Sequence, residues 1–420
     1  SLSEIPKINS NDVILYHFSV GSAIIRKFLS KQECKKVMIY HNITPPGFFA
    51  PYDKNATAST KNGLDELVKM SGLFDCCLAD SEFNKQDLIK AGYKCPITVL
   101  PILVPFKDYE QTPDASIIKR YNEDGWVNWL FVGRVVPNKK QEDIIKAFSY
   151  YKKHINVNSR LFIVGGKTIG LYWDRLQRYV ELLDVHDVIF TEHTSFQAIL
   201  AYYKLADVFV CMSEHEGFCV PLLEAMKFKV PVIAYAAAAV PETLGGTGVI
   251  VREKDTVLIA KLVDKIVKDE YLKQNIVNKQ LYRLKYFSYD NVSKIANKKL
   301  KKIINSVQDN EYVEKQVCAL NTDSIEIEHI INIIKKEIEN DNSIDDELEF
   351  SEVPIEAYSK TNDASIEKSN DGAFIHHGVK QKVKENIFRP CYHFIYSVAP
   401  NAADAIKHII YSLYHGLHRN

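Results

Sequence analysis

The chain has no excess charge, because its 53 basic side chains balance 53 acidic ones. Nothing in this balance indicates nucleic acid or another strongly charged partner. Its eight cysteines include no CxxC pair, which argues against a disulfide framework or a zinc site. No uninterrupted apolar run approaches the roughly 18 to 20 residues that cross a bilayer, and no signal-peptide pattern opens the chain. We therefore expect a cytoplasmic protein, or one lying on the inner face of the membrane, without a metal.

A dinucleotide loop is also missing. No GxGxxG follows an expected strand, and the glycine pair at 165–166 has the pattern of a plain turn. This argues against an NAD-dependent oxidoreductase. The sequence begins with Ser1, and we expect its N-terminus to be cut or incompletely represented.

The 420 residues are 46% apolar and 25% charged, enough for two cores and an appendage. Short β-branched runs alternate with amphipathic helical stretches from 12 to about 283, which predicts an α/β protein built on parallel sheets. The polar, proline-bearing segment 101–125 reads as a linker between two Rossmann-like series. Strands are expected at 12–16, 36–40, 74–79 and 97–100, and in a second series that starts at 128–133.

The character of the sequence changes after about residue 305. Residues 337–352 are acidic and poor in aromatic side chains, which predicts a mobile, solvated helix or connector. Beyond 379 the chain is basic and aromatic, and apolar residues recur at helical spacing from 406 to 417. A helix on a membrane surface and a helix docked on the protein itself fit this tail equally well. His376 and His377 adjoin, but no further metal ligands stand at useful spacing.

One short stretch, SEHEGFCVPLLE at 213–224, places two glutamates around an expected helix start. Pro221 suits a first helical turn, and free amides near 219–222 favour a phosphate. A carboxylate repels phosphate, so Glu216 and Glu224 are better acceptors for neutral hydroxyls on either side of it. A sugar on one side and a ribose on the other fit this arrangement.

Cations for such a diphosphate stand in the stretch GRVVPNKK at 133–140. Gly133 ends an expected strand, and Arg134 and Lys139 follow it, where parallel strands present ligands at their carboxyl ends. Taken singly, a glutamate at a helix start more often complements the dipole, and a loop cation is more often solvated.

Together these motifs closely resemble the retaining glycosyltransferases of family 4. The resemblance rests on GRVVPNKK, on the two glutamates separated by seven residues, and on VPVIAYAAAAVPETLGGTGVIV, and it covers about 12–305. YHNITPPGFFAPY and ADSEFNKQDLIKAGY look like the bacterial branch that assembles O-antigen, lipopolysaccharide and other surface polysaccharides.

The resemblance implies the GT-B architecture, in which two Rossmann-like domains face a cleft, here with a helical C-terminal appendage. The implied parts are an N-terminal acceptor-side domain at 1–122, a nucleotide-sugar domain at 123–286, a closing helix at 287–305 that returns to the first domain, an acidic connector at 306–373, and a basic, aromatic, amphipathic tail at 374–420.

The resemblance also implies roles for the catalytic set Glu216, His41, Arg134 and Lys139. The two cations would hold the diphosphate, Glu216 would contact donor-sugar hydroxyls, and His41 would face that sugar across the cleft. Glu224 would bind the ribose. The other implied donor-binding residues surround these groups: Gly133, Gly217, Phe218, Cys219, Val220 and Leu222.

The implied activity is that of a hexosyltransferase that retains anomeric configuration by front-side attack, with no dedicated protein nucleophile, metal or cofactor. The donor is expected to be GDP-mannose first, with dTDP- and UDP-sugars open, and the acceptor a glycan or lipid-linked glycan. The tail would contact the membrane surface or a partner protein.

The sequence departs from the family in three respects, of which the first favours a second hypothesis. The usual first strand and glycine-rich loop are not found before Asp12, Lys140 and Glu192 stand where glycine is common, and the region after residue 305 matches no family pattern. Base recognition near 191–193 is therefore expected to differ. A catalytically weak GT-B-fold scaffold or binding subunit of a glycan-assembly complex is the alternative.

Overall fold

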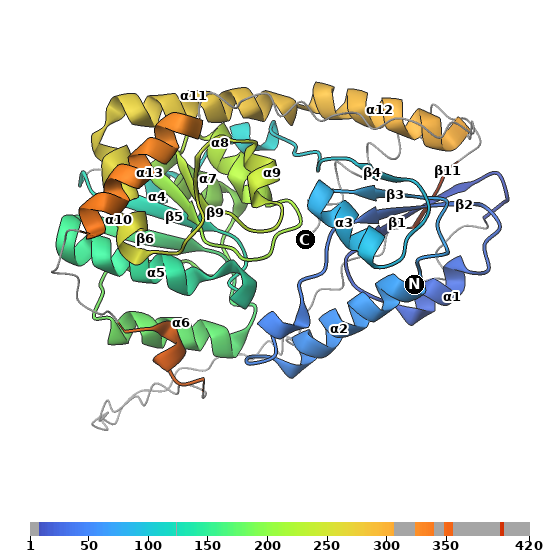
Figure 1. The fold of residues 1–420 in the computed structure, drawn as a ribbon, viewed down its shortest axis with the longest axis horizontal. Helices are drawn as coiled ribbons and strands as arrows, with labels where there is room; N and C mark the ends of the chain where they lie inside the picture. Colours follow the sequence, from blue (N-terminus) through green and yellow to red (C-terminus); the bar gives the residue numbers. More distant parts are fainter. Residues whose placement is uncertain (1–7, 123, 306–323, 340–347, 356–394, 399–420) are drawn as a thin grey trace, which may run out of the picture.

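The computed structural model describes residues 8–122, 124–305, 324–339, 348–355 and 395–398. They form two sheets with helices on both faces, and the two units lie beside each other (Figure 1). This confirms the α/β prediction. In this part of the chain, no helix is both long and apolar enough to cross a membrane.

The first sheet has the order β11-β1-β2-β3-β4. Four strands are parallel, and β11 (Ile395–Val398) runs antiparallel to β1 at its edge. Alternate side chains of β1 face opposite cores, with Ile14 and Tyr16 toward helices α1, α2 and α3. The remaining elements are β1 (Val13–Phe18), β2 (Lys35–Tyr40), β3 (Cys76–Ala79), β4 (Ile97–Val99), α1 (Ala23–Leu29), α2 (Lys54–Lys69) and α3 (Glu82–Lys90).

The second sheet has the order β10-β9-β8-β5-β6-β7, with every neighbouring pair parallel. The chain builds outward from β5 to β7 and then returns to the other side of β5 with β8. The switch point between β5 and β8 is where doubly wound sheets bind ligands. The strands are β5 (Val127–Val132), β6 (Ser159–Val164), β7 (Val188–Phe190), β8 (Val208–Cys211), β9 (Val232–Tyr235) and β10 (Val249–Val251).

Helices cover both faces of this second sheet. Trp129 and Phe131 of β5 face the core under α5, α6 and α10, whereas Leu130 and Val132 face the core under α4, α7, α8 and α9. The helices are α4 (Ala115–Tyr121), α5 (Gln141–Tyr150), α6 (Gly170–Leu182), α7 (Phe196–Leu205), α8 (Val220–Lys227), α9 (Val240–Leu244) and α10 (Thr256–Lys268).

Two long helices connect the units. Helix α11 (Glu270–Tyr286) lies on the second unit, and α12 (Tyr289–Asn305) continues across to the first (Figure 1). Val292, Ala296 and Leu300 of α12 share a core with Val13 and Leu15 of β1. The helix thus covers the face of the first sheet opposite to α1, α2 and α3.

Two expectations need correction. The expected linker at 101–125 contains α4, whose Ile117 packs into a core with α7. The prediction of a mobile, solvated segment at 337–352 is wrong for 348–352, because Leu348 and Phe350 pack into the core of the second unit. Residues 337–339 end helix α13 (Ser324–Glu339), where Glu337 and Glu339 are exposed and Ile334 packs on the same core. The expected tail helix and the two adjoining histidines lie outside the described residues.

Candidate active site at the switch point of the second sheet

Two loops meet at the switch point of the second sheet. The loop after β5 includes the turn η4 (Pro137–Lys139), and the loop after β8 leads into α8. Asn138 joins them, because its carbonyl accepts from the Glu214 amide at 2.9 Å and its side-chain amide donates to the His215 carbonyl at 3.0 Å. These bonds bring Lys139 beside Glu216.

Lys139 and Glu216 form a buried ion pair between Nζ and Oε1. The side chains are only 14% and 8% exposed. Burial lowers the pKa of Lys139, but the charge and hydrogen bond of Glu216, together with Cys219 and Cys211, raise it, and the net shift is upward. The predicted proximity of cation and glutamate is therefore present, with the two groups in direct contact.

The other predicted donor residues come from the same loop after β5 and from helix α8. Arg134 is exposed, and its carbonyl accepts a bond from Gln141. Gly133 has a φ of 149°, a conformation that side-chain-bearing residues rarely adopt. Glu224 points its two oxygens at tyrosine hydroxyls, Tyr109 at 2.5 Å and Tyr203 at 2.6 Å.

Helix α8 begins at Val220 with Pro221 in its first turn, which confirms the predicted helix start. Phe218, Cys219 and Leu222 are buried in the core, and Val220 is half-buried. What this stretch can offer a ligand is therefore its backbone. Cys219 holds a left-handed conformation with φ of 70°, which turns the chain into the helix.

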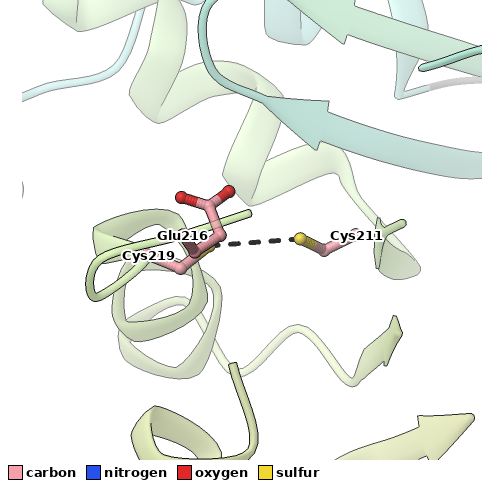
Figure 2. A group of neighbouring side chains, drawn as sticks. All are labelled: Cys211, Glu216 and Cys219. Atoms are coloured by element: carbon pink, nitrogen blue, oxygen red, sulfur yellow. Dashed lines mark hydrogen bonds between the residues drawn. The ribbon is translucent and has the colours of Figure 1, made fainter. Parts of the chain in front are cut away.

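Three potential metal ligands lie beneath this helix start: Cys211 at the end of β8, Glu216 and Cys219 (Figure 2). Their ligand atoms lie within 4.8 Å of one another, and the two sulfur atoms are 4.0 Å apart. Their hydrogen bond lowers the pKa of the Cys211 thiol and raises that of Cys219. The ammonium of Lys139 already supplies a positive charge to Glu216.

On the first sheet, His41 follows β2 and is part of a chain of three side chains. Its Nδ1 lies 2.9 Å from Asp80 Oδ2, and its Nε2 lies 2.7 Å from His17 Nδ1. Burial lowers the pKa of His41, but the Asp80 carboxylate overcomes this and the net shift is upward. Burial and then His41 lower the pKa of His17 to about 3. His41 is therefore the more basic ring of the two.

The two units meet at Gly217. Ser81, the N-cap of α3, donates to the Gly217 carbonyl at 2.7 Å. A methyl group on Gly217 would lie 2.6 Å from Asn42 Cβ and 3.2 Å from the His41 carbonyl. The loop carrying Glu216 thus reaches the segment carrying His41, as the prediction for these residues requires. Both His41 ring nitrogens already have partners, so its side-chain contact with a donor sugar stays a prediction.

A second contact between the units lies at the start of α9. The Glu242 carboxylate accepts from the backbone amide of Glu82 at 2.8 Å, at the N-terminus of α3. The ring of His215 contacts Phe48 and Phe83 of the first unit, with ring centroids 6.3 and 5.6 Å apart. These contacts hold the loop after β8 against the first unit.

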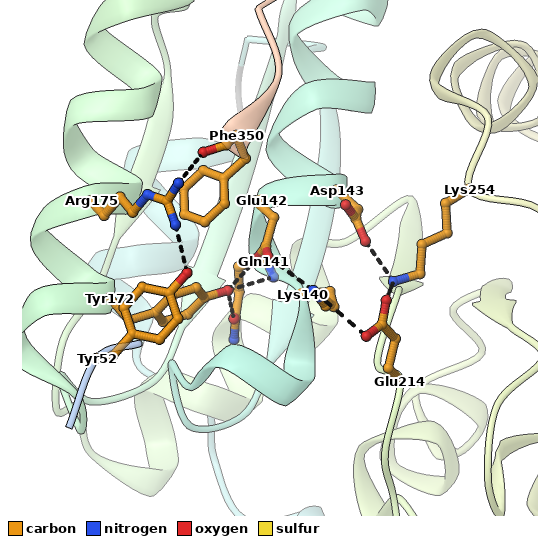
Figure 3. Close-up of polar contacts among 10 residues, drawn as sticks. All are labelled: Tyr52, Lys140, Gln141, Glu142, Asp143, Tyr172, Arg175, Glu214, Lys254 and Phe350. Atoms are coloured by element: carbon orange, nitrogen blue, oxygen red, sulfur yellow. Dashed lines mark hydrogen bonds and ion pairs between the residues drawn. The ribbon is translucent and has the colours of Figure 1, made fainter. Parts of the chain in front are cut away.

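A polar network on α5 and α6 extends to the loops beside the Lys139–Glu216 pair, since Lys140 lies 3.6 Å from Glu214 (Figure 3). Arg175 donates to Tyr52 of the first unit at 2.7 Å and to the Phe350 carbonyl at 2.5 Å. Tyr172 bonds the carboxylate of Glu142. The pKa of Glu142 is raised to about 7, mainly by burial and secondly by the negative charge of Asp143. The network ties the segment after α13 to both units.

The sequence analysis did not single out several of these residues. Asp80 and His17 stand at the ends of β3 and β1, beside His41 at the end of β2. Because carboxyl ends of parallel strands share one edge of a sheet, the rule that selected Arg134 would have found them. No sequence signal indicates Tyr109 or Tyr203, which reach Glu224 only through tertiary packing.

Residues 119–281 match the family profile described as Glycosyl transferases group 1. The chain is 23% identical over 266 residues to O-antigen chain mannosyltransferase B of Escherichia coli, covering 61% of this chain and 68% of that protein. It is 32% identical over 190 residues to a GDP-mannose-dependent alpha-(1-6)-phosphatidylinositol monomannoside mannosyltransferase of Mycolicibacterium smegmatis, covering 42% and 49%.

Solved structures show a similar fold. Sucrose-phosphate synthase from Thermosynechococcus elongatus superposes with a TM-score of 0.56 at 18% identity, covering 67% of this chain and 71% of that one. Anabaena HepE in complex with UDP and glucose gives 0.53 at 18% identity, covering 65% and 72%. These likenesses confirm the predicted architecture of two Rossmann-like units.

Proposed function

The chain carries a group 1 glycosyl transferase domain at 119–281, and from this premise we propose that it moves a sugar from a nucleoside-diphosphate donor to a surface glycan with retention of anomeric configuration. The prediction of a nucleotide-sugar-dependent glycosyltransferase is confirmed. The proposal adds the acceptor, the stereochemistry of transfer, and the residues that bind the donor and stabilise the leaving group.

The observation that carries the proposal is the meeting of Lys139, Glu216 and the start of α8 at the switch point between β5 and β8. The diphosphate lies at the amides near 217–220, where a helix start favours an anion. Lys139 stands beside it, and Arg134 follows β5 on the same edge. Their charge stabilises the departing nucleoside diphosphate.

Glu216 contacts the donor sugar. Its Oε1 is bonded to Lys139, so the ion pair fixes the carboxylate while Oε2 accepts a sugar hydroxyl. The His41 segment closes the other side of the sugar, since it reaches the Gly217 loop.

Retention is proposed from the resemblance to family 4, and the partners of the two nearby carboxylates argue against a covalent route to it. Asp80 is bonded to His41 and Glu216 to Lys139, so neither is poised as a nucleophile for a double displacement. Retention then requires the acceptor hydroxyl to attack from the face from which the diphosphate leaves and to give its proton to that phosphate. The contacts at Gly217 and Glu242 exclude water from this step.

GDP-mannose is the proposed donor. It is supported by a relative whose name specifies GDP-mannose and by another named as an O-antigen mannosyltransferase. HepE, in contrast, was solved with UDP and glucose, so UDP-sugars belong in the same test. The proposed acceptor is a glycan, free or lipid-linked, at the cytosolic face of the membrane.

Transfer should be assayed with radiolabelled GDP-mannose, UDP-glucose and dTDP-rhamnose and a lipid-linked glycan acceptor, with NMR of the product's anomeric centre. We expect one donor to be used and its configuration kept. Arg134→Ala should lose transfer, whereas Arg252→Ala, which changes an exposed arginine of the same unit, should not. An inverted product would refute retention.

A catalytically weak scaffold is the second candidate. The first sheet supports it, because β1 pairs on its outer side with the antiparallel edge strand β11 and, among the described residues, not with a further parallel strand. A scaffold would bind a nucleotide without turnover with any of the three donors. Turnover that Arg134→Ala abolishes would exclude it.

The tail supplies the proposed membrane contact, on the basis of its basic and aromatic composition. Deleting 399–420, which leaves β11 in place, should release the protein from vesicles containing anionic lipid, with nucleotide affinity unchanged. Vesicle binding that survives the deletion would leave docking on a partner, or packing on the protein itself, as the role of the tail.

A further inference from the structure

The carboxylate of Glu224 is held by two tyrosines from separate parts of the chain. Tyr109 belongs to the turn η3 (Asp108–Glu110), between the two sheets in sequence, and donates to Oε1 at 2.5 Å. Tyr203 belongs to α7 and donates to Oε2 at 2.6 Å. The two tyrosines are buried and Glu224 is half-buried.

Packing fixes both hydroxyls in place. The ring of Tyr203 stacks on Phe228, with centroids 5.2 Å apart and planes 9° apart. The ring of Tyr109 meets Phe196 edge-on at 5.3 Å. A rotation of either ring would disturb an aromatic cluster, so the carboxylate is clamped and not merely contacted.

The clamp leaves acceptor capacity on both oxygens. An ionised carboxylate has about four acceptor positions, two on each oxygen. Each tyrosine uses one position, so each oxygen keeps one. A pair of neighbouring hydroxyls, such as the 2′ and 3′ hydroxyls of a ribose, has two donors that match this remaining pair.

The two bonds also favour the ionised form. Burial raises the pKa of Glu224 and the net shift is upward, but the hydroxyls of Tyr109 and then Tyr203 reduce this rise. A neutral acid would present one donor and fewer acceptors to a diol. The two bonds therefore act in favour of the charged form, which binds hydroxyls more strongly.

We propose that Tyr109 and Tyr203 are positioning residues that clamp Glu224 for the ribose diol of the donor nucleotide. This inference rests on the proposed function and deepens it, because it makes the segment between the two sheets part of nucleotide recognition. Neither tyrosine needs to touch the nucleotide.

The test is calorimetric binding of matched nucleotides: GDP with 2′-deoxy-GDP, and UDP with 2′-deoxy-UDP. The wild type should prefer one ribonucleotide to its deoxy form by about tenfold, the contribution of one hydrogen bond to a charged group. Tyr109→Phe and Tyr203→Phe should reduce this preference to less than threefold and leave the affinity for the deoxy form unchanged. These variants keep the aromatic packing.

Tyr202→Phe is the matched control. It removes a hydroxyl one residue along α7, from a ring that lies 4.9 Å from Phe162. The control should keep the tenfold preference. Circular dichroism and melting temperature would show that all three variants fold.

The possible outcomes separate the inference from the proposed function. If Glu224→Gln abolishes the ribose preference but the two tyrosine variants keep it, the clamp is refuted and the ribose site stands. If Tyr109→Phe strengthens ribonucleotide binding, that hydroxyl occupies the diol's place and the inference is also refuted. If dTDP, which has no 2′ hydroxyl, is the only nucleotide that binds the wild type, the inference is refuted and the proposed function stands. If neither pair nor dTDP binds, the proposed function itself fails.

Discussion

Breaking the buried pair of Lys139 and Glu216 one partner at a time should cost more stability than removing both. Lys139→Met leaves a carboxylate that is 8% exposed without its cation, and Glu216→Gln leaves an ammonium that is 14% exposed without its anion. Removing one partner of a buried pair costs about 3 to 5 kcal/mol, whereas neutral replacement of both is close to neutral. We expect each single variant to lose about 3 kcal/mol.

The double variant should lose less than either single one, which gives a coupling energy of more than about 3 kcal/mol. Urea unfolding followed by tryptophan fluorescence suits this measurement, because Trp126, Trp129 and Trp173 all lie in the second unit. The exposed pair Lys335 and Glu253, at 3.2 Å, is the control.

The control pair should couple by less than about 1 kcal/mol. Additive losses at Lys139 and Glu216, within about 0.5 kcal/mol, would refute the view that the two charges depend on each other. Equal coupling in both pairs would show that burial does not matter here.

Three other predictions concern the contact between the units and the network in Figure 3. The new methyl group of Gly217→Ala would lie 2.6 Å from Asn42 Cβ and should push the loop away from the first unit. This variant should have a lower turnover and, in small-angle scattering, a larger radius of gyration. The control Gly47→Ala, whose methyl group would meet no atom within 4 Å, should change neither quantity. The pKa of Glu142 is raised to about 7 in the folded protein, so the stability that its protonated form contributes is present below the usual pKa of 4.5 and is lost as pH rises through 7. The free energy of unfolding of Glu142→Gln, measured by urea titration, should therefore rise by up to about 3 kcal/mol relative to the wild type between pH 5 and pH 8. A difference that stays constant with pH would contradict this. Arg175→Met should make the chain at Phe350 more susceptible to chymotrypsin, because it removes the guanidinium that donates to the carbonyls of 350, 351 and 353. Unchanged cleavage would show that other contacts hold the segment.

The position of the candidate site was predictable because parallel strands share one edge for all their carboxyl ends. His41 and Arg134 each follow a strand, and Glu216 comes a few residues after another. The pairing of Lys139 with Glu216 was not predictable from spacing. The two residues are 77 positions apart, and Asn138 joins their loops through bonds that only the folded chain shows.

The departures from the family pattern have a physical explanation. Lys140 and Glu192 stand where glycine is common, and both adopt left-handed backbone conformations with φ of 53° and 55°. The family's glycine preference thus reflects a backbone requirement that these two residues also meet. The glycine pair at 165–166 is more than a plain turn, since a methyl on Gly165 would lie 1.8 Å from the Gly133 carbonyl.

Composition led to wrong predictions for parts of two segments, 101–125 and 337–352, because an average over many residues hides a single residue that packs into a core. One aromatic side chain, Phe350, anchors an acidic stretch through a cation–π contact with Arg175 at 4.2 Å. Tyr109 does the same for the expected linker by reaching Glu224. Average polarity does not reveal one buried ring.

The central claim, that a nucleoside diphosphate binds where Arg134 and Lys139 face the start of α8, is tested most directly by thermal shift. GDP, UDP, dTDP and CDP would each be added to the wild type, Arg134→Ala and the control Arg252→Ala. A ligand at 100 times its Kd adds about 2.7 kcal/mol to folded stability. We predict that one nucleotide raises the melting temperature of the wild type and the control but not of Arg134→Ala. An equal rise in all three proteins, or no rise in any, would contradict the claim.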